Sequence, residues 1–236
     1  MCTVSFVFSD KKAIFTHNRD EKVARPSAIE PKEYLVNNKK IFFPKDPKAG
    51  GTWYAISEQG TIVVLLNGAE EKHEVKLPYR KSRGLILLDI ISSESANKEW
   101  QNIDLENIEP FTLVLYQNQE LYQLRWNGLQ KSTLQLDKTK SHIWSSSTLY
   151  PKNIRENRDN WFHAFLNTKL QITEDEMYNF HRYTENDNTE NGLIINRNDM
   201  MKTLSITQAI VQEKKVTLHH HDLISKKDFT TTVSTF

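Results

Sequence analysis

The sequence predicts an α+β protein in which antiparallel sheets carry helices on their faces. Apolar and alternating patterns along the 236 residues follow the order strands, helices, strands, and most neighbouring strands are separated by only a tight turn. Tight turns connect antiparallel strands, because parallel strands need a long crossover between them. No internal repeat or linker-like segment interrupts the pattern, so we expect a single domain spanning residues 1–236.

The first part of the chain reads as short strands. Residues 2–8 form an apolar run typical of a buried strand, and residues 13–16 follow after a turn, so the two segments predict a hairpin. We expect the polar segment 17–21 to leave the sheet. Further strands are predicted at residues 33–36, 40–43, 52–57 and 61–66. The last of them ends at Asn67-Gly68, a strong turn dipeptide.

Helices are predicted between two groups of strands. Pro78 precedes a helix over 79–93 that is apolar nearly all round and hence buried. Pro151 opens a second helix reaching 167, and a capping box of Thr173 and Glu176 starts a third that reaches 183. The other patterns predict strands at 111–117, 121–126, 142–145, 203–212 and 216–221, a mobile loop over 183–198, and an edge strand or a tail at the end of the chain.

Composition excludes several classes of protein. The 31 basic and 30 acidic residues give a net charge of +1, whereas a nucleic-acid binder would show a basic excess. No apolar run approaches the roughly 20 residues needed to cross a bilayer, and the N-terminus lacks the pattern of a signal peptide. We therefore expect a cytoplasmic protein that does not span the membrane. A single cysteine allows no internal disulfide and no zinc-ligand spacing, so no metal is expected.

Cys2, which directly follows Met1, has two interpretations. Methionine aminopeptidases remove Met1 when the next side chain is small, and removal would place a thiol and an α-amine on one residue. The reference pKa of that amine is about 7.7–8.0, so near neutral pH it can take the thiol proton. Such a self-contained nucleophile and base defines N-terminal-nucleophile hydrolases. The other interpretation is a structural cysteine in a buried strand, because free cysteine is often buried.

Three polar side chains could complete a hydrolase site. The second strand of a tight hairpin runs back alongside the first, so Arg19 and Asp20 should end near Cys2. Arg19 would lower the pKa of the thiol by its charge, and Asp20 would hold the α-ammonium. Asn67, at a sharp corner, would donate to an oxyanion together with a backbone N–H. Taken alone, a solvated turn at 18–21 and an ordinary turn asparagine remain the alternatives.

Several motifs in this sequence resemble those of one family, the NRDE family of transport and Golgi organisation protein 2. The resemblance is strongest within residues 1–84. The motifs are Cys2-Thr3, Thr16-His17-Asn18-Arg19-Asp20-Glu21 followed by Arg25-Pro26, Gly50-Gly51-Thr52-Trp53, Leu66-Asn67-Gly68 and Tyr79-Arg80-Lys81-Ser82-Arg83-Gly84.

More distantly, the chain is similar to choloylglycine hydrolases and penicillin V acylases. That resemblance implies an αββα four-layer sandwich of two antiparallel sheets flanked by helices. It implies Cys2 as nucleophile, Asp20 as the group holding the amine and Asn67 as an oxyanion donor. A family arginine falls on His17 here, a family asparagine falls near Ser146, and a late family arginine has at best Lys202 in its place. His17, Asn18, Trp53 and Ser146 are accordingly expected to line the substrate site.

Two functions follow as hypotheses. The first is a cysteine hydrolase that cleaves a carbon–nitrogen amide bond of a small acyl-amide and needs no cofactor. The second is a non-catalytic carrier of a hydrophobic ligand, such as haem or an acyl lipid, which the family resemblance also implies. Haem would take Cys2 or a histidine as its axial ligand. The run His219-His220-His221 is better explained as a polar edge strand, because strand side chains alternate between faces.

Whether Arg19 and Asp20 are buried distinguishes the two interpretations of this segment, a catalytic site and a surface turn. We expect both side chains to turn inward toward Cys2, because fold stability alone gives little reason to bury a charged pair.

Overall fold

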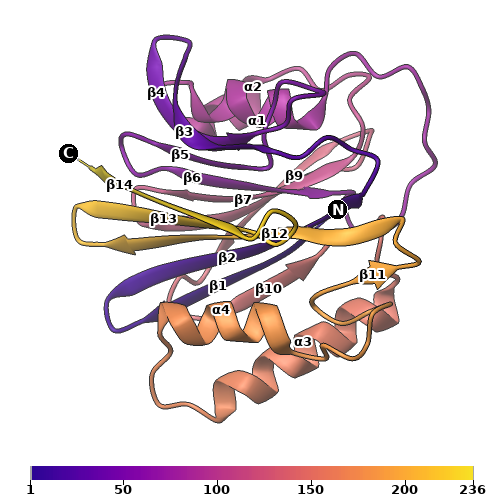
Figure 1. The fold of residues 1–236 in the computed structure, drawn as a ribbon. Coiled ribbons are helices and arrows are strands. Elements are labelled where there is room, and N and C mark those ends of the chain that lie inside the picture. The colour runs from indigo at the N-terminus through magenta and orange to yellow at the C-terminus, as the bar shows by residue number, and fades with distance from the viewer. Residues whose placement is uncertain (1, 236) are drawn as a thin grey trace. The chain divides into compact units, whose positions relative to one another are not determined.

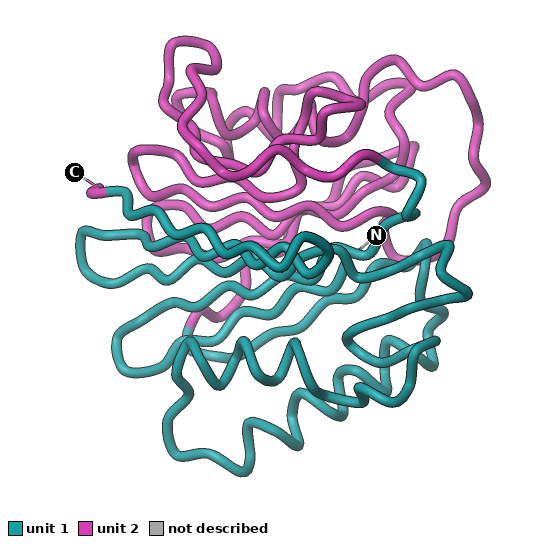
Figure 2. Tube along the Cα trace, in the orientation of Figure 1, with its two compact units in different colours: residues 1–25, 139–233 teal, residues 26–138, 234–236 magenta. Residues whose placement is uncertain are grey.

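The structure, a computed structural model, describes residues 2–235, which form two compact units (Figure 2). The first unit contains the described residues up to 25 together with 139–233, and the second contains 26–138 and 234–235. Each unit holds one antiparallel seven-stranded sheet. The prediction of a single domain over 1–236 stays a prediction.

The first unit is a sheet built from the two ends of the chain. Its strand order is β10-β1-β2-β12-β13-β14, with β11 paired to β12. The N-terminal hairpin β1–β2 therefore lies between strands that follow it by more than a hundred residues. The strands are β1 (Cys2–Ser9), β2 (Lys12–Lys22), β10 (His142–Ser145), β11 (Asn196–Arg197), β12 (Met201–Gln212), β13 (Lys215–Asp222) and β14 (Lys227–Ser234).

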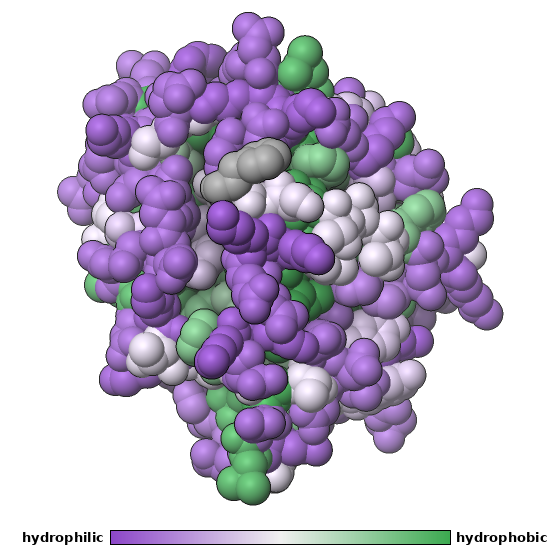
Figure 3. Space-filling model, turned by 90° about the vertical axis from the view of Figure 1, so that its left-hand side faces the viewer, coloured by the Kyte–Doolittle hydropathy of each residue, from purple (hydrophilic) through white to green (hydrophobic). Residues whose placement is uncertain are grey.

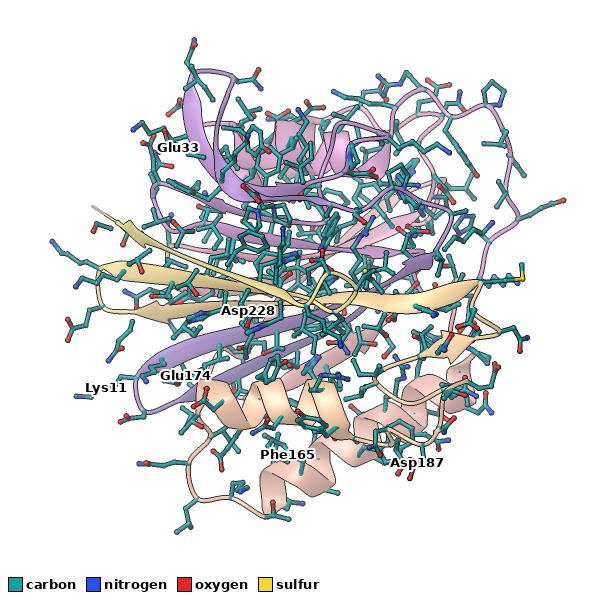
Figure 4. The ribbon with its side chains drawn as sticks, in the orientation of Figure 1. Lys11, Glu33, Phe165, Glu174, Asp187 and Asp228 are labelled. Atoms are coloured by element: carbon teal, nitrogen blue, oxygen red, sulfur yellow. The ribbon has the colours of Figure 1, made fainter. Side chains whose placement is uncertain are left out.

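Two helices, α3 (Lys152–Asn167) and α4 (Glu174–Tyr183), cover one face of this sheet (Figure 1). Phe165, labelled in Figure 4, extends from α3 toward α4, and its ring centroid lies 4.9 Å from that of Phe180. The lysine of β2 at position 12 also reaches the start of α4, with its Nζ 3.2 Å from a Glu174 carboxylate oxygen. The apolar core between helices and sheet comprises Val7, Ile14, Phe162, Ile172, Met177, Phe180 and Leu193.

The second unit is a meander of hairpins with two helices, in the strand order β3-β4-β5-β6-β7-β8-β9. Its elements are β3 (Ile29–Val36), β4 (Lys39–Lys45), β5 (Tyr54–Ser57), β6 (Ile62–Asn67), α1 (Arg83–Ile91), α2 (Ala96–Asn102), β7 (Phe111–Gln117), β8 (Glu120–Trp126) and β9 (Lys131–Leu136). The start of α1 touches the loop before β5, where an added Cβ on Gly51 would lie 2.5 Å from the backbone carbon of Gly84.

Most predicted elements are present, and the differences have local causes. The predicted helix over 79–93 begins only at Arg83, because the Ser82 side chain caps it by accepting from the Leu85 N–H. Sequence patterns missed α2 and β9, which are short and polar. The expected mobile loop over 183–198 instead folds back on itself through hydrogen bonds and contains β11. The C-terminal segment forms β14, an edge strand.

The segment 17–21 was expected to leave the sheet, and that prediction is wrong. β2 continues through it as far as Lys22 and pairs with β1 on one side and β12 on the other. Likewise His219, His220 and His221 lie in β13, which pairs with both β12 and β14 and is therefore not an edge strand. The first error arises because the side-chain partners of Asn18 and Asp20 are more than a hundred residues away in sequence. The second arises because the sequence left open whether the segment after β13 is a strand, and β14 covers the edge that β13 would otherwise form.

The surface shows no large apolar face in the view of Figure 3. Hydrophilic side chains cover most of that face, and hydrophobic ones occur in small separate groups. Single exposed apolar residues, such as Leu129 and Leu170, are normal on globular proteins. Among residues 2–235, no helix is both long and apolar enough to cross a bilayer.

Gly51→Ala should destabilise the second unit, because its new Cβ would overlap the backbone of Gly84. Overpacking of this kind costs about 1–3 kcal/mol. Urea unfolding monitored by circular dichroism measures the change, with Leu129→Ala, at a residue 90% exposed, as the control that should change stability by no more than about 0.5 kcal/mol. Equal midpoints for the two variants would contradict the close approach.

Candidate active site

Cys2 opens β1 and is buried, with 3% of its surface exposed. The hairpin register places Arg19 of β2 directly opposite Cys2. On the other side of β1, the N–H of Ser146 donates to the carbonyl oxygen of Cys2 at 2.9 Å. The first residue of the strand is thus held from both sides.

Arg19 and Asp20 are both buried, as expected, but they leave β2 on opposite faces. Directly paired residues of antiparallel strands share a face, so Arg19 shares the face of Cys2. Neighbouring strand residues alternate, and Asp20 accordingly bonds to groups of the helix-covered side. The expectation that both side chains turn inward rather than into solvent is confirmed, since Arg19 is 4% and Asp20 0% exposed, but only Arg19 shares the face of the Cys2 side chain.

Two hydroxyl groups fix the Asp20 carboxylate. The Tyr150 hydroxyl donates to one oxygen at 2.6 Å, and the Thr203 hydroxyl donates to the other at 2.7 Å. The Thr203 oxygen itself accepts from the N–H of Ile195 at 2.9 Å, which leaves its own proton for the carboxylate. Asp20 is therefore held in one orientation by donors from two different segments.

Arg158 of α3 supplies positive charge to this cluster although it is fully buried. Its guanidinium lies over the Tyr150 ring, 3.5 Å from the centroid. It donates to the Thr3 hydroxyl and the Gly192 carbonyl, and also to the Asn191 carbonyl at 3.2 Å. Burial raises the pKa of Asp20, and the charge of Arg158 opposes that rise. The pKa of Tyr150 is raised well above its ordinary value, chiefly by burial, so its hydroxyl remains a donor.

A second chain of buried hydrogen bonds runs through Asn18, His181 and Ser5. The Asn18 amide nitrogen donates to the carbonyls of His181 and Leu193 at 3.0 and 2.7 Å, so its oxygen faces His181 Nδ1 at 2.7 Å. That nitrogen must then carry the ring proton. Nε2 is left as the acceptor for the Ser5 hydroxyl at 2.7 Å. Burial lowers the pKa of His181 to about 3, consistent with a neutral ring.

The remaining predicted residues lie as follows. His17 shares the face of Cys2 and is fully buried, and burial lowers the pKa of its imidazole well below the usual value. The Ser146 hydroxyl lies 2.9 Å from that of Thr148. Lys202 pairs with the exposed Asp199 at 2.7 Å.

Trp53 and Asn67 belong to the second unit. Trp53 is buried, and its carbonyl accepts from the Leu65 N–H at 2.9 Å. Asn67 ends β6, and the chain turns at Gly68, whose φ is +83°. The assigned roles of all these side chains in binding or catalysis stay predictions.

Sequence reasoning missed several buried partners of Asn18 and Asp20, among them Arg158 and His181. A signal existed for Arg158, because it falls on the apolar stripe of α3 between Ile154 and Phe162 at helical spacing. His181 similarly follows Met177 by one turn of α4. Charged or polar residues on an apolar face indicate a buried polar partner. Among residues 2–235, no cluster of three or more His, Cys, Asp or Glu side chains could hold a metal ion.

The state of the Cys2 thiol bears on any chemistry at this position. Burial raises its pKa, the carboxylate of Asp20 acts in the same direction, and the charge of Arg19 opposes them. The thiol is therefore protonated at neutral pH. A nucleophilic role would require a nearby base, because the thiolate is the reactive form.

Solved structures identify the fold class of this chain. A conjugated bile acid hydrolase from Clostridium perfringens aligns with a TM-score of 0.57 and 8% identity, over 98% of this chain and 92% of that one. The Caenorhabditis elegans N-acylethanolamine-hydrolyzing acid amidase ortholog aligns with a TM-score of 0.60 and 9% identity, over 88% of this chain and 92% of the other. The predicted N-terminal-nucleophile hydrolase fold is thus confirmed.

Within that fold class, the chain belongs to the Transport and Golgi organisation 2 family, whose sequence model matches residues 1–235. A mouse relative, the Transport and Golgi organization 2 homolog, is 31% identical over 104 residues. That match covers 40% of this chain and 36% of the mouse protein.

Asp20→Ala should destabilise the fold, because it leaves the buried hydroxyls of Tyr150 and Thr203 without their acceptor, at about 1–3 kcal/mol for each. Thermal and urea unfolding measure this loss. The matched control is Asp159→Ala, which removes an exposed carboxylate from α3 beside His163 and should cost no more than about 1 kcal/mol. Overlapping melts of Asp20→Ala and the parent would show that the hydrogen bonds to Asp20 contribute nothing to stability.

Acidification should unfold the protein partly through His181. Its folded pKa of about 3 lies below the ordinary 6.5, so its contribution is present above pH 6.5 and is lost as pH falls toward 3. Between pH 7 and 4.5 the loss from this residue amounts to about 2–3 kcal/mol.

His17 and His220 also have lowered pKa values and also lose stability on acidification. A His181 variant separates the loss of stability due to His181 from theirs. His181→Gln should start less stable at pH 7 and lose less stability on acidification, as measured by urea midpoints. His163→Gln, at an exposed position, should follow the parent. A parallel loss in the parent and in His181→Gln would refute the assignment.

Proposed function

We propose that this protein is an N-terminal-nucleophile cysteine hydrolase that cleaves a carbon–nitrogen amide bond of a small acyl-amide. The observation that carries the proposal is the position of Cys2. It is the first residue of a buried central hairpin and lies directly opposite Arg19. Excision of Met1 would give this buried thiol its own α-amine, which is the base that a protonated thiol requires.

The proposed reaction proceeds in two halves. The α-amine of Cys2 takes the thiol proton, and the thiolate attacks the amide carbonyl to give a tetrahedral intermediate. Collapse breaks the carbon–nitrogen bond, and the α-ammonium protonates the leaving amine. Water then attacks the thioester, which releases the carboxylic acid and returns the proton to the thiol.

Other residues would support these steps. Asp20, which Tyr150 and Thr203 hold in place, would stabilise the α-ammonium. Asn67 and a backbone N–H would donate to the oxyanion. The N–H of Ser146 is an unsuitable donor, because it already bonds the Cys2 carbonyl. The fold and the family support this proposal, since the similar solved proteins include hydrolases.

The proposal predicts that purified protein begins at Cys2 and that iodoacetamide modifies this residue. Intact mass decides the first point, and peptide mapping decides the second. Alkylation should follow a pH profile with an apparent pKa below that of the thiol alone, because the amine assists. Asp20→Asn should reduce the rate at neutral pH if it folds, as checked by circular dichroism. Retention of Met1, or an unmodified Cys2 in folded protein, would refute the mechanism.

A second candidate function is non-catalytic transport of a hydrophobic ligand such as haem or an acyl lipid. One observation favours it: the buried imidazole of His17 is neutral where the similar hydrolases are expected to carry a positive arginine. A neutral histidine or Cys2 would provide an axial ligand for haem. Haem titration tests this version, because a saturable Soret shift that Cys2→Ala or His17→Ala abolishes would support it. Absence of a shift would eliminate haem as the ligand.

A further inference from the structure

A β-bulge in β12 places two hydroxyl groups on opposite faces of the first sheet. Thr203 lies opposite Asp20, and Ser205 lies opposite Arg19, with the register shift between them. Residues two apart in a regular strand share one face. The extra residue, Leu204, reverses this, so that Thr203 bonds Asp20 on the helix-covered face while Ser205 shares the face of Arg19 and Cys2. Bulges that re-aim a side chain occur often next to active sites.

Cys2, Arg19 and Ser205 consequently form one row across three adjacent strands, β1, β2 and β12. Neighbouring strands lie about 5 Å apart, so Ser205 is roughly 10 Å from Cys2 with Arg19 between them. Arg19 and Ser205 are only 4% and 3% exposed. The row therefore aligns a thiol, a guanidinium and a hydroxyl away from bulk water.

The Ser205 hydroxyl differs from its neighbours in lacking a hydrogen bond. Its Oγ is buried and has no partner among residues 2–235. One step along the same face, the Thr207 hydroxyl bonds His220 Nδ1 at 2.8 Å. A buried hydroxyl without a partner destabilises a fold, and such exceptions call for an explanation beyond packing.

We propose that Arg19 and Ser205 form a subsite for a carboxylate group of the substrate. A guanidinium offers five donors in a planar fork that matches a carboxylate, and the Ser205 hydroxyl adds a further donor from the neighbouring strand. The proposal rests on the proposed amide hydrolysis and names its substrate class. The amide cleaved at Cys2 would carry a carboxylate a few bonds from the carbonyl carbon, and uncharged amides would bind weakly.

Binding of a matched ligand pair tests the subsite. N-acetylglycine carries the carboxylate, and N-acetylglycinamide is its neutral counterpart. With processed full-length protein, N-acetylglycine should raise the melting temperature and slow iodoacetamide labelling of Cys2, whereas the neutral compound should do neither. Ser205→Ala should weaken N-acetylglycine binding about tenfold without lowering the melting temperature of the free protein. Thr207→Ser, which keeps its hydroxyl on the same face, should bind like the parent.

Several outcomes would overturn the subsite. These are equal effects of the charged and neutral ligands, no effect of either, or unchanged binding by Ser205→Ala. Arg19→Gln serves as a second variant and should weaken N-acetylglycine binding more than Ser205→Ala does. The thermal shift does not depend on Cys2 reactivity. If N-acetylglycine but not N-acetylglycinamide raises the melting temperature while Cys2 resists labelling, the subsite is supported and the hydrolase mechanism is rejected.

Discussion

The central constraint on this protein is that a strand paired on both sides carries charged and polar side chains out of reach of water. Each of these groups needs a partner, because an unpaired buried charge costs several kcal/mol. For Asp20 the partners are Tyr150, Thr203 and the charge of Arg158, and for Asn18 they are His181 and Leu193. The strand β2 therefore dictates which helix and loop residues must pack against it.

This constraint divides the interface between sheet and helices into two parts. Toward the hairpin turn, Val7 and Ile14 pack with Phe162 and Phe180, and apolar burial supplies the stability. Toward Cys2, hydrogen bonds from α3, α4 and the loop after α4 replace apolar contacts. Hydrogen bonds are directional, so the polar part determines the position of the helices more sharply than apolar packing does.

The sequence predicted those features that depend on neighbouring residues. The hairpin that brings Arg19 to Cys2, the capping box of α4 and the proline start of α3 are local signals, and the structure bears them out. Features that depend on distant residues were not predictable. The segment 17–21 looks like a turn because its second neighbouring strand, β12, and the side-chain partners of Asn18 and Asp20 lie more than a hundred residues away. A bulge that turns Ser205 leaves no trace in composition. For the same reason, the opposite facing of Asp20 and Arg19 required knowledge of the continued strand.

The strand order has a consequence for how the protein is made. Both strands flanking the N-terminal hairpin come from the last hundred residues, after the complete second unit. While the ribosome synthesises the intervening segment, the hairpin has no neighbours to pair with. The hairpin therefore waits for its neighbours through most of translation, which adds about 5–20 residues per second. Only when β10 and β12 are added are both strands of the hairpin paired on both sides, so the surroundings of Cys2 are completed by the last part of the chain to be synthesised.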